Sequence, residues 1–536
     1  MKLTQLTLLT VMSLLSQNLF ASSADTLPSK NSMNHHKHYS HGAEHTKNSL
    51  NNQVKHSGNQ KMISSDTKVS SHNDMHDMHG MHGMKKASKD RLTPASYFGV
   101  ARNQPLKPLI TIQNMSTEKG VFKAILEPKQ SVKRMSDKAS PELWLYNGEI
   151  LPLIEVNAGD KVEITVKNRL NEDTTVHWHG LAIPPSQDGN PQDPIAPNAQ
   201  RTYEFTTNED MAGTHWFHPH THLRTSTQVA KGLAGAFIIK NSNDPLAHIP
   251  EQTLFFSDLK LDKNGQIAEN DMIDIMNGRE GQFALINGQW EPEIELDGTQ
   301  RWRLINGNSA RYLNFSFPKE MVEVYLVATD GGLIESPQQI ESLLLTPGER
   351  AEIVVTPKSD KIFSLMASAY DRDKMGPVPK EVDLVLAQIH PKVGTRIKLP
   401  STLTDITPLP KPSVTRKVIF SEEMAPLKFL INGQSHDMNR IDFKMNKGEV
   451  ELWEITNQSH MDHNFHLHGP QFQVIEFENN GVVSKPPFTL FKDTINVRPG
   501  ETIRVLTQQN HTGIRMFHCH ILEHEDAGMM GQVEVL

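Results

Sequence analysis

Residues 159–168 read GDKVEITVKN: a glycine, then apolar side chains at every second position, then a closing asparagine. The same pattern returns as GTQRWRLIN at 298–306 and as GEVELWEITN at 448–457. An Asn-Gly pair comes before each segment. Apolar residues at every second position beside Asn-Gly turns predict short antiparallel strands. The threefold repeat therefore predicts an all-β chain of three Greek-key β-sandwich domains.

Length and composition indicate where these domains lie. The chain has 536 residues, enough for about three domains. Residues 25–93 are rich in Ser, Asn, Lys, His and Met and poor in aromatic side chains, so we expect a disordered His/Met-rich segment there. A polar stretch near residue 242 and a Pro-rich stretch after residue 400 interrupt the remainder. We expect the three sandwiches at residues 94–242, 243–400 and 401–536.

The first 24 residues predict a signal peptide. Lys2 is the only charge before an apolar stretch, and the small residues Ser22, Ser23 and Ala24 follow that stretch. It is shorter than the about 20 apolar residues that cross a bilayer, and no Arg-Arg pair precedes it. We therefore expect Sec-type export, to the periplasm or beyond, and no membrane segment. The net charge of -8 gives no support to nucleic-acid binding.

Histidine pairs occupy matching positions in the first and third repeats. They lie nine and eleven residues after the closing asparagine, where the middle repeat has phenylalanines. Residues two apart on a strand point to the same face, so both imidazoles of a pair can serve one site. The positions are His177 and His179 in the first repeat, Phe315 and Phe317 in the middle one, and His466 and His468 in the third.

A second His-x-His pair follows in each outer domain: His218 and His220 in the first, His518 and His520 in the third. The pattern predicts eight imidazoles that the first and third domains present to one another across an interface. His215 and His222 flank the first-domain pair outside this spacing, and we expect them to be structural or to make a minor contact outside the ligand set.

Cys519 is the only cysteine and lies between two of these histidines. A lone cysteine cannot form a disulfide within the chain. Its expected partners are His463, His524 and Met529. Two imidazoles, one thiolate and a weak axial thioether make a blue-copper electron-transfer site.

Four motifs together resemble the copper motifs of three-domain multicopper oxidases: HWHG at 177–180, WFHPH at 216–220, HNFHLHG at 463–469 and HCHILEHEDAGMM at 518–530. The resemblance runs from about residue 95 to the C-terminus. Within that family the chain is most similar to the bacterial copper efflux oxidases, which oxidise Cu(I). The resemblance implies cupredoxin-like domains, four copper ions in each chain, and reduction of dioxygen to water.

The resemblance also implies a role for each motif residue. The type 1 copper takes His463, Cys519, His524 and Met529; the type 2 copper takes His177 and His466; one type 3 copper takes His179, His218 and His520, and its partner takes His220, His468 and His518. Asp188 and Glu525 match acidic residues of the family and are expected to deliver protons. The alternative for both carboxylates is that they hydrogen-bond a ligand imidazole.

Three functions remain open at the level of sequence. Cu(I) oxidation in copper tolerance is favoured by residues 75–84, MHDMHGMHGM, because thioether and imidazole suit copper. A laccase-like oxidase of phenols or aromatic amines is the alternative, because the Met-rich insertion of copper efflux oxidases is missing. A non-enzymatic copper buffer is the third. Met461 and Asp462 are candidate substrate-copper residues, and we expect a monomer because one chain supplies every ligand.

Overall fold

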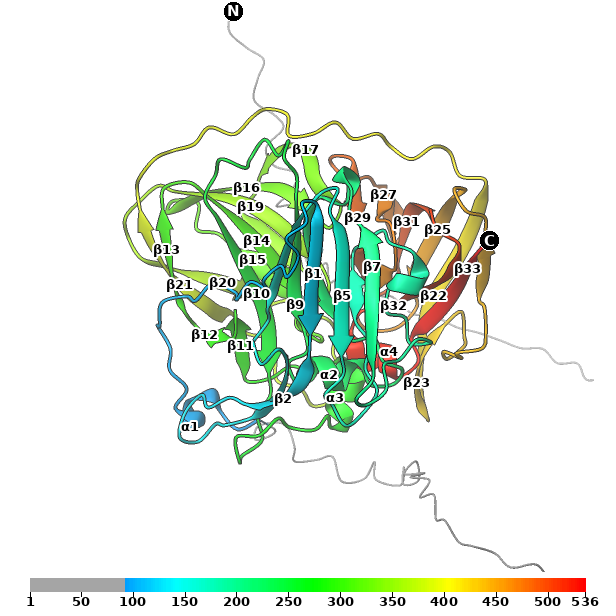
Figure 1. The fold of residues 1–536 in the computed structure, drawn as a ribbon, viewed down its shortest axis with the longest axis horizontal. Coiled ribbons are helices and arrows are strands. Elements are labelled where there is room, and N and C mark those ends of the chain that lie inside the picture. The colour runs from blue at the N-terminus through cyan, green and yellow to red at the C-terminus, as the bar shows by residue number, and fades with distance from the viewer. Residues whose placement is uncertain (1–91) are drawn as a thin grey trace, which may run out of the picture. The chain divides into compact units, whose positions relative to one another are not determined.

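The computed structural model describes residues 92–536. The expected signal peptide and nearly all of the expected His/Met-rich segment lie outside the described residues. Most of the regular structure in the described part is strand, arranged as three sandwiches (Figure 1), so the expected all-β fold is confirmed. Its helices are short: α1 (Ala95–Phe98), α2 (Thr225–Ala230), α3 (Met272–Asn277) and α4 (Leu522–Asp526). Among residues 92–536 none of the helices could span a bilayer.

The first sandwich has its own buried core and supplies two of the histidine pairs. One sheet has the order β1-β5-β7 and the other the order β4-β9-β8-β6, with β2 and β3 paired beside them. The strands are β1 (Val121–Leu126), β2 (Pro128–Val132), β3 (Glu142–Tyr146), β4 (Leu153–Asn157), β5 (Lys161–Lys167), β6 (His177–His179), β7 (Gln200–Thr206), β8 (Gly213–His218) and β9 (Gly235–Lys240).

The middle sandwich packs a larger core between two sheets of order β12-β11-β10-β14-β19-β16-β17 and β13-β21-β20-β15-β18. Its strands are β10 (Glu251–Leu259), β11 (Phe283–Ile286), β12 (Gln289–Trp290), β13 (Glu293–Asp297), β14 (Gln300–Asn306), β15 (Leu313–Ser316), β16 (Val322–Thr329), β17 (Gly332–Gln339), β18 (Ser342–Leu345), β19 (Arg350–Pro357), β20 (Phe363–Ser368) and β21 (Leu384–Lys392).

The third sandwich follows a long yellow connection in Figure 1. One sheet has the order β23-β22-β25-β31-β27-β28, with β29 on β27, and the other the order β24-β33-β32-β26-β30. The strands are β22 (Val414–Met424), β23 (Leu427–Ile431), β24 (Phe443–Met445), β25 (Val450–Asn457), β26 (His463–Leu467), β27 (Phe472–Asn479), β28 (Val482–Ser484), β29 (Leu490–Lys492), β30 (Thr494–Val497), β31 (Glu501–Gln508), β32 (Gly513–Cys519) and β33 (Met530–Val535).

The sequence repeat corresponds to one structural unit in each sandwich. β5, β14 and β25 are inner strands, each parallel to one neighbour and antiparallel to the other. The closing asparagine is buried and its amide donates to two carbonyls in the chain that follows. Asn168 donates to Glu172 and Ile195, Asn306 to Arg311 and Leu345, and Asn457 to Met461 and Val497, at 2.8–3.0 Å. This amide fixes the loop that leads to the next strand, and in the outer sandwiches the first histidine pair lies on that strand or at its end.

We predict that Asn457→Ala destabilises the copper-free protein by about 3 kcal/mol, because two buried carbonyls lose their donor. Urea unfolding followed by tryptophan fluorescence measures the change. Asn446→Ala is the matched control, since Asn446 is exposed and donates to the half-buried Glu449, and its effect should stay within about 0.5 kcal/mol. Equal effects of the two variants would contradict a structural role for the repeated asparagine.

Candidate metal centres

The eight paired histidines come together at the boundary of the first and third sandwiches. In the first, β6 pairs with β8 so that His177 lies opposite His218. In the third, β26 pairs with β32 so that His466 lies opposite His518. All eight imidazoles are buried, with exposures of 0–1%. The expectation that two domains present these rings to one another therefore matches the arrangement in the structure.

Rings from the two sandwiches interleave. His177 stacks on His468 with centroids 3.8 Å apart, and His179 stacks on His466 at 3.9 Å. The remaining rings close the cluster through nitrogen–nitrogen approaches. His518 Nε2 lies 3.2 Å from His220 Nε2 and 3.3 Å from His468 Nε2, and His520 Nε2 lies 3.3 Å from His179 Nδ1. His220, His468 and His518 form one three-nitrogen group, and His177, His179 and His218 form another.

Backbone carbonyls fix which ring nitrogen carries the proton. The Nδ1 atoms of four rings lie 2.8–3.0 Å from carbonyl oxygens: His177 on Asp188, His218 on Pro219, His466 on Asp493 and His518 on Cys519. A carbonyl can only accept, so Nδ1 donates and each neutral ring keeps a lone pair on Nε2. Burial, and then neighbouring imidazoles, holds the pKa of His218 and His466 well below the usual range, so these rings stay neutral.

Whether a metal fits this cluster depends on the Nε2 lone pairs that point into it. Among residues 92–536, Nε2 of His177, His218 and His466 is buried and has no hydrogen-bond partner. Lone pairs that face one another in a dry interior repel unless a cation lies between them. Imidazole nitrogens in this arrangement are the donors that copper takes.

A second, smaller group surrounds the cysteine. Cys519 Sγ lies 3.4 Å from His463 Nδ1 and 3.9 Å from His524 Nδ1, and the two Nδ1 atoms are 3.1 Å apart. Met529 is fully buried in the same apolar cluster. His524 Nε2 donates to the Met276 carbonyl, which leaves Nδ1 as the acceptor facing the sulfur. Burial raises the pKa of the thiol to about 12, so a metal must displace its proton.

One strand connects the two groups. Successive side chains of a strand point to opposite faces. His518 on β32 and His520, directly after its end, therefore face the imidazole cluster, and Cys519 between them faces His463 and His524.

Comparison with known proteins agrees with this arrangement. Family models described as multicopper oxidase match residues 129–244, 255–382 and 407–536. The multicopper oxidase of Staphylococcus haemolyticus is 34% identical over 411 residues, covering 73% of this chain and 83% of that protein. The chain is a multicopper oxidase. As a member of this family it is an oxidoreductase that uses copper, dioxygen and a reducing substrate.

Solved structures of other oxidases resemble it closely. The multicopper oxidase of Campylobacter jejuni, described as a metallo-oxidase, gives a TM-score of 0.80 at 43% identity and covers 83% of this chain and 98% of its own. A laccase-like multicopper oxidase from the lignin-degrading Ochrobactrum sp. gives 0.71 at 28% identity, covering 81% of this chain and 100% of its own. The expected three-domain cupredoxin-like family is thus confirmed, while membership of the copper-efflux branch stays a prediction.

Asp188 lies inside the imidazole cluster of the oxidase. Its Oδ2 accepts from His468 Nδ1 and from Arg515 Nη1, both at 3.1 Å, and its Oδ1 lies 3.1 Å from His177 Nδ1. Asp493, which the sequence motifs did not point to, has similar contacts: its Oδ1 lies 3.0 Å from His179 Nε2. Burial acts to raise the pKa of Asp493, but Arg350 and Thr494 together act against it, and the pKa lies below its usual value.

Glu525 lies on α4, against the other end of the cluster. Its carboxylate oxygens lie 3.2 Å from His518 Nδ1 and 3.6 Å from His220 Nδ1. Burial, and then the neighbouring Asp526, raises the pKa of Glu525 well above its usual range, which favours the protonated form of this carboxyl. A protonated carboxyl beside the ring cluster can act as a general acid.

The candidate substrate-copper residues lie beside the cysteine group but are enclosed. Met461 is fully buried. The Asp462 carboxylate is also buried and accepts from Tyr370 Oη and Asn496 Nδ2, both at 2.7 Å. Two other methionines pack in or against the same apolar cluster as Cys519. Met276 lies on α3 with its carbonyl on His524, and Met375 is tied to the same helix by two hydrogen bonds with Asn277.

The flanking histidines lie outside the ring cluster. His215 Nε2 donates to the Met211 carbonyl at 2.8 Å, and burial lowers the pKa of His215 to about 4. His222 lies against His436 of the third sandwich, with ring centroids 5.7 Å apart. The contacts of His215 agree with the structural role expected for it.

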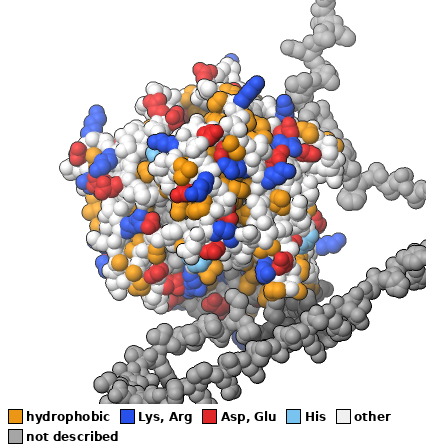
Figure 2. Space-filling model, turned by 90° about the vertical axis from the view of Figure 1, so that its right-hand side faces the viewer, with side chains coloured by type: hydrophobic (Ala, Val, Ile, Leu, Met, Phe, Trp, Pro, Cys, Tyr) orange, Lys and Arg blue, Asp and Glu red, His pale blue; other side chains and the backbone are white. Residues whose placement is uncertain are grey.

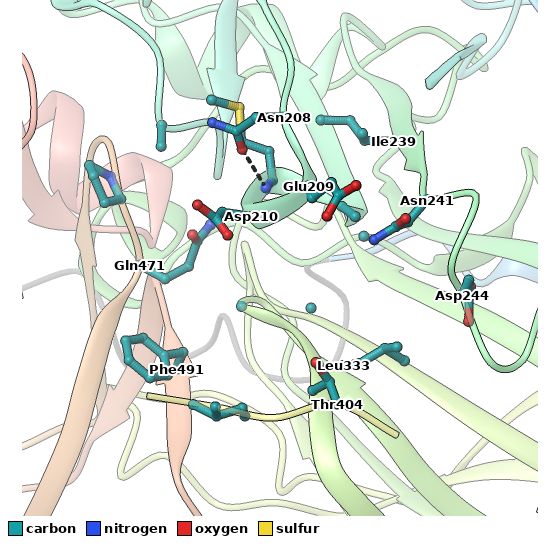
Figure 3. Close-up of a pocket in the computed structure, with 18 of the residues that line it drawn as sticks. Asn208, Glu209, Asp210, Ile239, Asn241, Asp244, Leu333, Thr404, Gln471 and Phe491 are labelled. Carbon is teal, nitrogen blue, oxygen red and sulfur yellow. Dashed lines mark hydrogen bonds between the residues drawn. The ribbon is translucent and has the colours of Figure 1, made fainter. Parts of the chain in front are cut away.

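A cavity of about 1010 Å³ opens between the sandwiches near the cluster. Figure 3 shows Asn208, Glu209 and Asp210 above it and Phe491 and Gln471 along one side. Gln471 Nε2 donates to the Gly180 carbonyl at 2.6 Å and lies 3.4 Å from Asp493 Oδ2. One side chain therefore separates this space from a carboxylate that contacts a cluster imidazole.

We predict that Glu525→Gln slows dioxygen uptake by about 100- to 10 000-fold because the site loses its proton donor. Copper content and the blue thiolate–copper absorption should be unchanged, since the amide keeps the shape of the carboxyl. Glu523→Gln is the matched control: Glu523 is buried on the same helix but accepts from Arg279 N and Ser309 Oγ. Loss of copper from Glu525→Gln would instead indicate that Glu525 only supports the ligands.

Proposed function

We propose that this oxidase couples one-electron oxidation of Cu(I) to four-electron reduction of dioxygen to water, in copper tolerance. The position of Cys519 carries the proposal, because its thiol belongs to one group of donors and its two sequence neighbours belong to the other. Bound copper would supply electron transfer at the cysteine site and dioxygen reduction at the imidazole cluster. The short covalent path along β32 suits transfer between them.

Four copper ions are proposed for each chain, with the motif residues as ligands. His463, Cys519, His524 and Met529 would hold the type 1 ion, His177 and His466 the type 2 ion, and His179, His218, His520, His220, His468 and His518 the type 3 pair. The ring nitrogens of His177, His179 and His218 lie close together, which supports two of the ligands of one type 3 ion. His520 joins that ion through its 3.3 Å approach to His179.

The residues beside these ligands divide the remaining tasks. Glu525 holds a proton next to His518 and His220. The reduction of dioxygen to water takes up protons, and this carboxyl would supply them at the imidazole cluster. Asp188 orients His177 through its carbonyl and His468 through its carboxylate. Apolar side chains exclude water from the cysteine site, where Phe429 stacks on His524 at 3.9 Å.

Methionine sulfur on the approach to His524 supports Cu(I) as the donor. Met272 and Met276 are four residues apart on α3 and share one face. Met272 is 44% exposed, whereas Met276 is partly buried and touches the type 1 ligand through its backbone. Thioethers bind soft Cu(I) well, so this face can bring it to the site. The likeness to a metallo-oxidase of Campylobacter jejuni points the same way.

Oxidation of phenols is the second candidate. The chain lacks the Met-rich insertion of copper efflux oxidases, and its relative from Ochrobactrum sp. acts on lignin model compounds. A copper buffer without turnover would rest on the His/Met-rich segment, which lies outside the described residues. Export by residues 1–24 and a monomeric state complete the proposal.

We predict that dioxygen uptake by the copper-loaded protein is fast with Cu(I) and slow with 2,6-dimethoxyphenol.

Met276→Leu should raise KM for Cu(I) about tenfold and leave phenol turnover unchanged, because leucine keeps the packing but removes the sulfur. Met115→Leu, at an exposed site of the first sandwich, is the control. Efficient phenol turnover with negligible Cu(I) oxidation would make the protein a laccase. If neither donor supports dioxygen uptake, the remaining function is that of a non-enzymatic copper buffer.

A further inference from the structure

Two buried aspartates each bridge the first and third sandwiches. Asp188 belongs to the first. Its backbone oxygen accepts from His177 of its own sandwich at 3.0 Å, and its carboxylate accepts from His468 of the third at 3.1 Å. His177 and His468 are the two members of one stacked pair. One residue thus fixes both rings of a pair that spans the boundary.

Asp493, from the third sandwich, makes the reciprocal set of contacts. Its backbone oxygen accepts from His466 of its own sandwich at 2.8 Å, and its carboxylate accepts from His179 of the first at 3.0 Å. These two rings form the other stacked pair. His466 corresponds to His177 in the sequence repeat, and His179 to His468, so Asp493 is the counterpart of Asp188.

An arginine holds each aspartate, and the two arginines come from different sandwiches. Arg515 belongs to the third sandwich, and its Nη1 donates to Asp188 Oδ2 at 3.1 Å. Arg350, on β19 of the middle sandwich, donates to both oxygens of Asp493, with Nη1 on Oδ1 and Nη2 on Oδ2 at 2.6 Å each. Both members of this second pair are completely buried. Two parallel bonds fix the plane of the carboxylate as well as its place.

Gly180 leaves the space in which the Arg350–Asp493 pair forms. A Cβ atom there would lie 2.4 Å from Arg350 Nη2 and 2.8 Å from Asp493 Oδ2. The glycine that closes the HWHG motif is therefore required by this pair as well as by its own backbone angle, φ +88°. The first sandwich gives the space, the middle one the cation and the third one the anion.

We propose that Arg350 and Asp493 are positioning residues of the type 2 copper, which complete the site from the sandwich that carries no ligand. The inference rests on the proposed ligand set. In that set the type 2 ion has only two protein ligands, His177 and His466, and each is oriented by the carbonyl of one aspartate. Loosening Asp493 releases one of those two ligands and the neighbouring type 3 ligand His179.

The test is the double variant Arg350→Leu with Asp493→Asn, which removes one positive and one negative charge together. Removing a buried pair jointly is tolerated far better than leaving one charge alone. We expect the type 2 EPR signal to be lost and copper per chain to fall by about one equivalent, while the blue type 1 absorption stays. Arg350→Lys keeps the charge without the paired contact, and should weaken retention of the type 2 copper against a chelator about tenfold.

The matched control is Arg311→Leu with Asp258→Asn. This is another buried arginine–aspartate pair with two hydrogen bonds in the middle sandwich, and its contacts do not include a cluster imidazole. It should keep all its copper. An unchanged type 2 signal in the double variant would overturn the inference. Loss of the blue absorption together with the type 2 signal would also overturn it, because the pair would then hold the fold. A wild-type protein without a type 2 signal would refute the ligand set itself.

Discussion

Neutral imidazoles meet across a sandwich boundary with their lone pairs directed inward, because backbone carbonyls bind the protons on the outer nitrogens. Such an arrangement is repulsive in a dry interior and becomes favourable only around a cation. The rest of the described structure holds these rings in place: the strands set their spacing, the repeated asparagines fix the loops before them, and two aspartates join the stacked pairs. Each of these contacts comes from the protein's own backbone and side chains.

The middle sandwich shows how one scaffold serves two purposes. At the positions of the first histidine pair it has Phe315 and Phe317, whose rings lie nearly parallel with centroids 6.3 Å apart in its core. It nevertheless reaches the copper region twice, with Arg350 beside the imidazole cluster and α3 beside the cysteine. Asp330 and Lys492 extend the charge network around Arg350, so the boundary of the middle and third sandwiches is polar where it meets the cluster. A sandwich without ligands thus still contributes to the environment of both sites.

Much of this could be read from the sequence, because it depends on local spacing. Two-residue periodicity indicated that His177 and His179 share a face, and the lone Cys519 between two histidines indicated a second donor group. Asp493 could not be found in this way, since it lies apart from the motifs and meets His179 only through the packing of separate sandwiches. Arg350 has no sequence signal for the same reason. Met276 was missed because α3 is a short helix in a chain whose periodicity favours strands.

The interleaving of rings from both ends of the chain constrains how the protein matures. His177 is made early, whereas His468, its stacking partner, and Cys519 belong to the last sandwich to be synthesised. A nascent chain that stops before residue 518 lacks His518, Cys519 and His520, so neither donor group is complete and insertion of the full set of metals must follow completion of the polypeptide. The complete apoprotein must therefore stay folded until the metals are bound, which makes the stability of the copper-free protein a requirement for maturation.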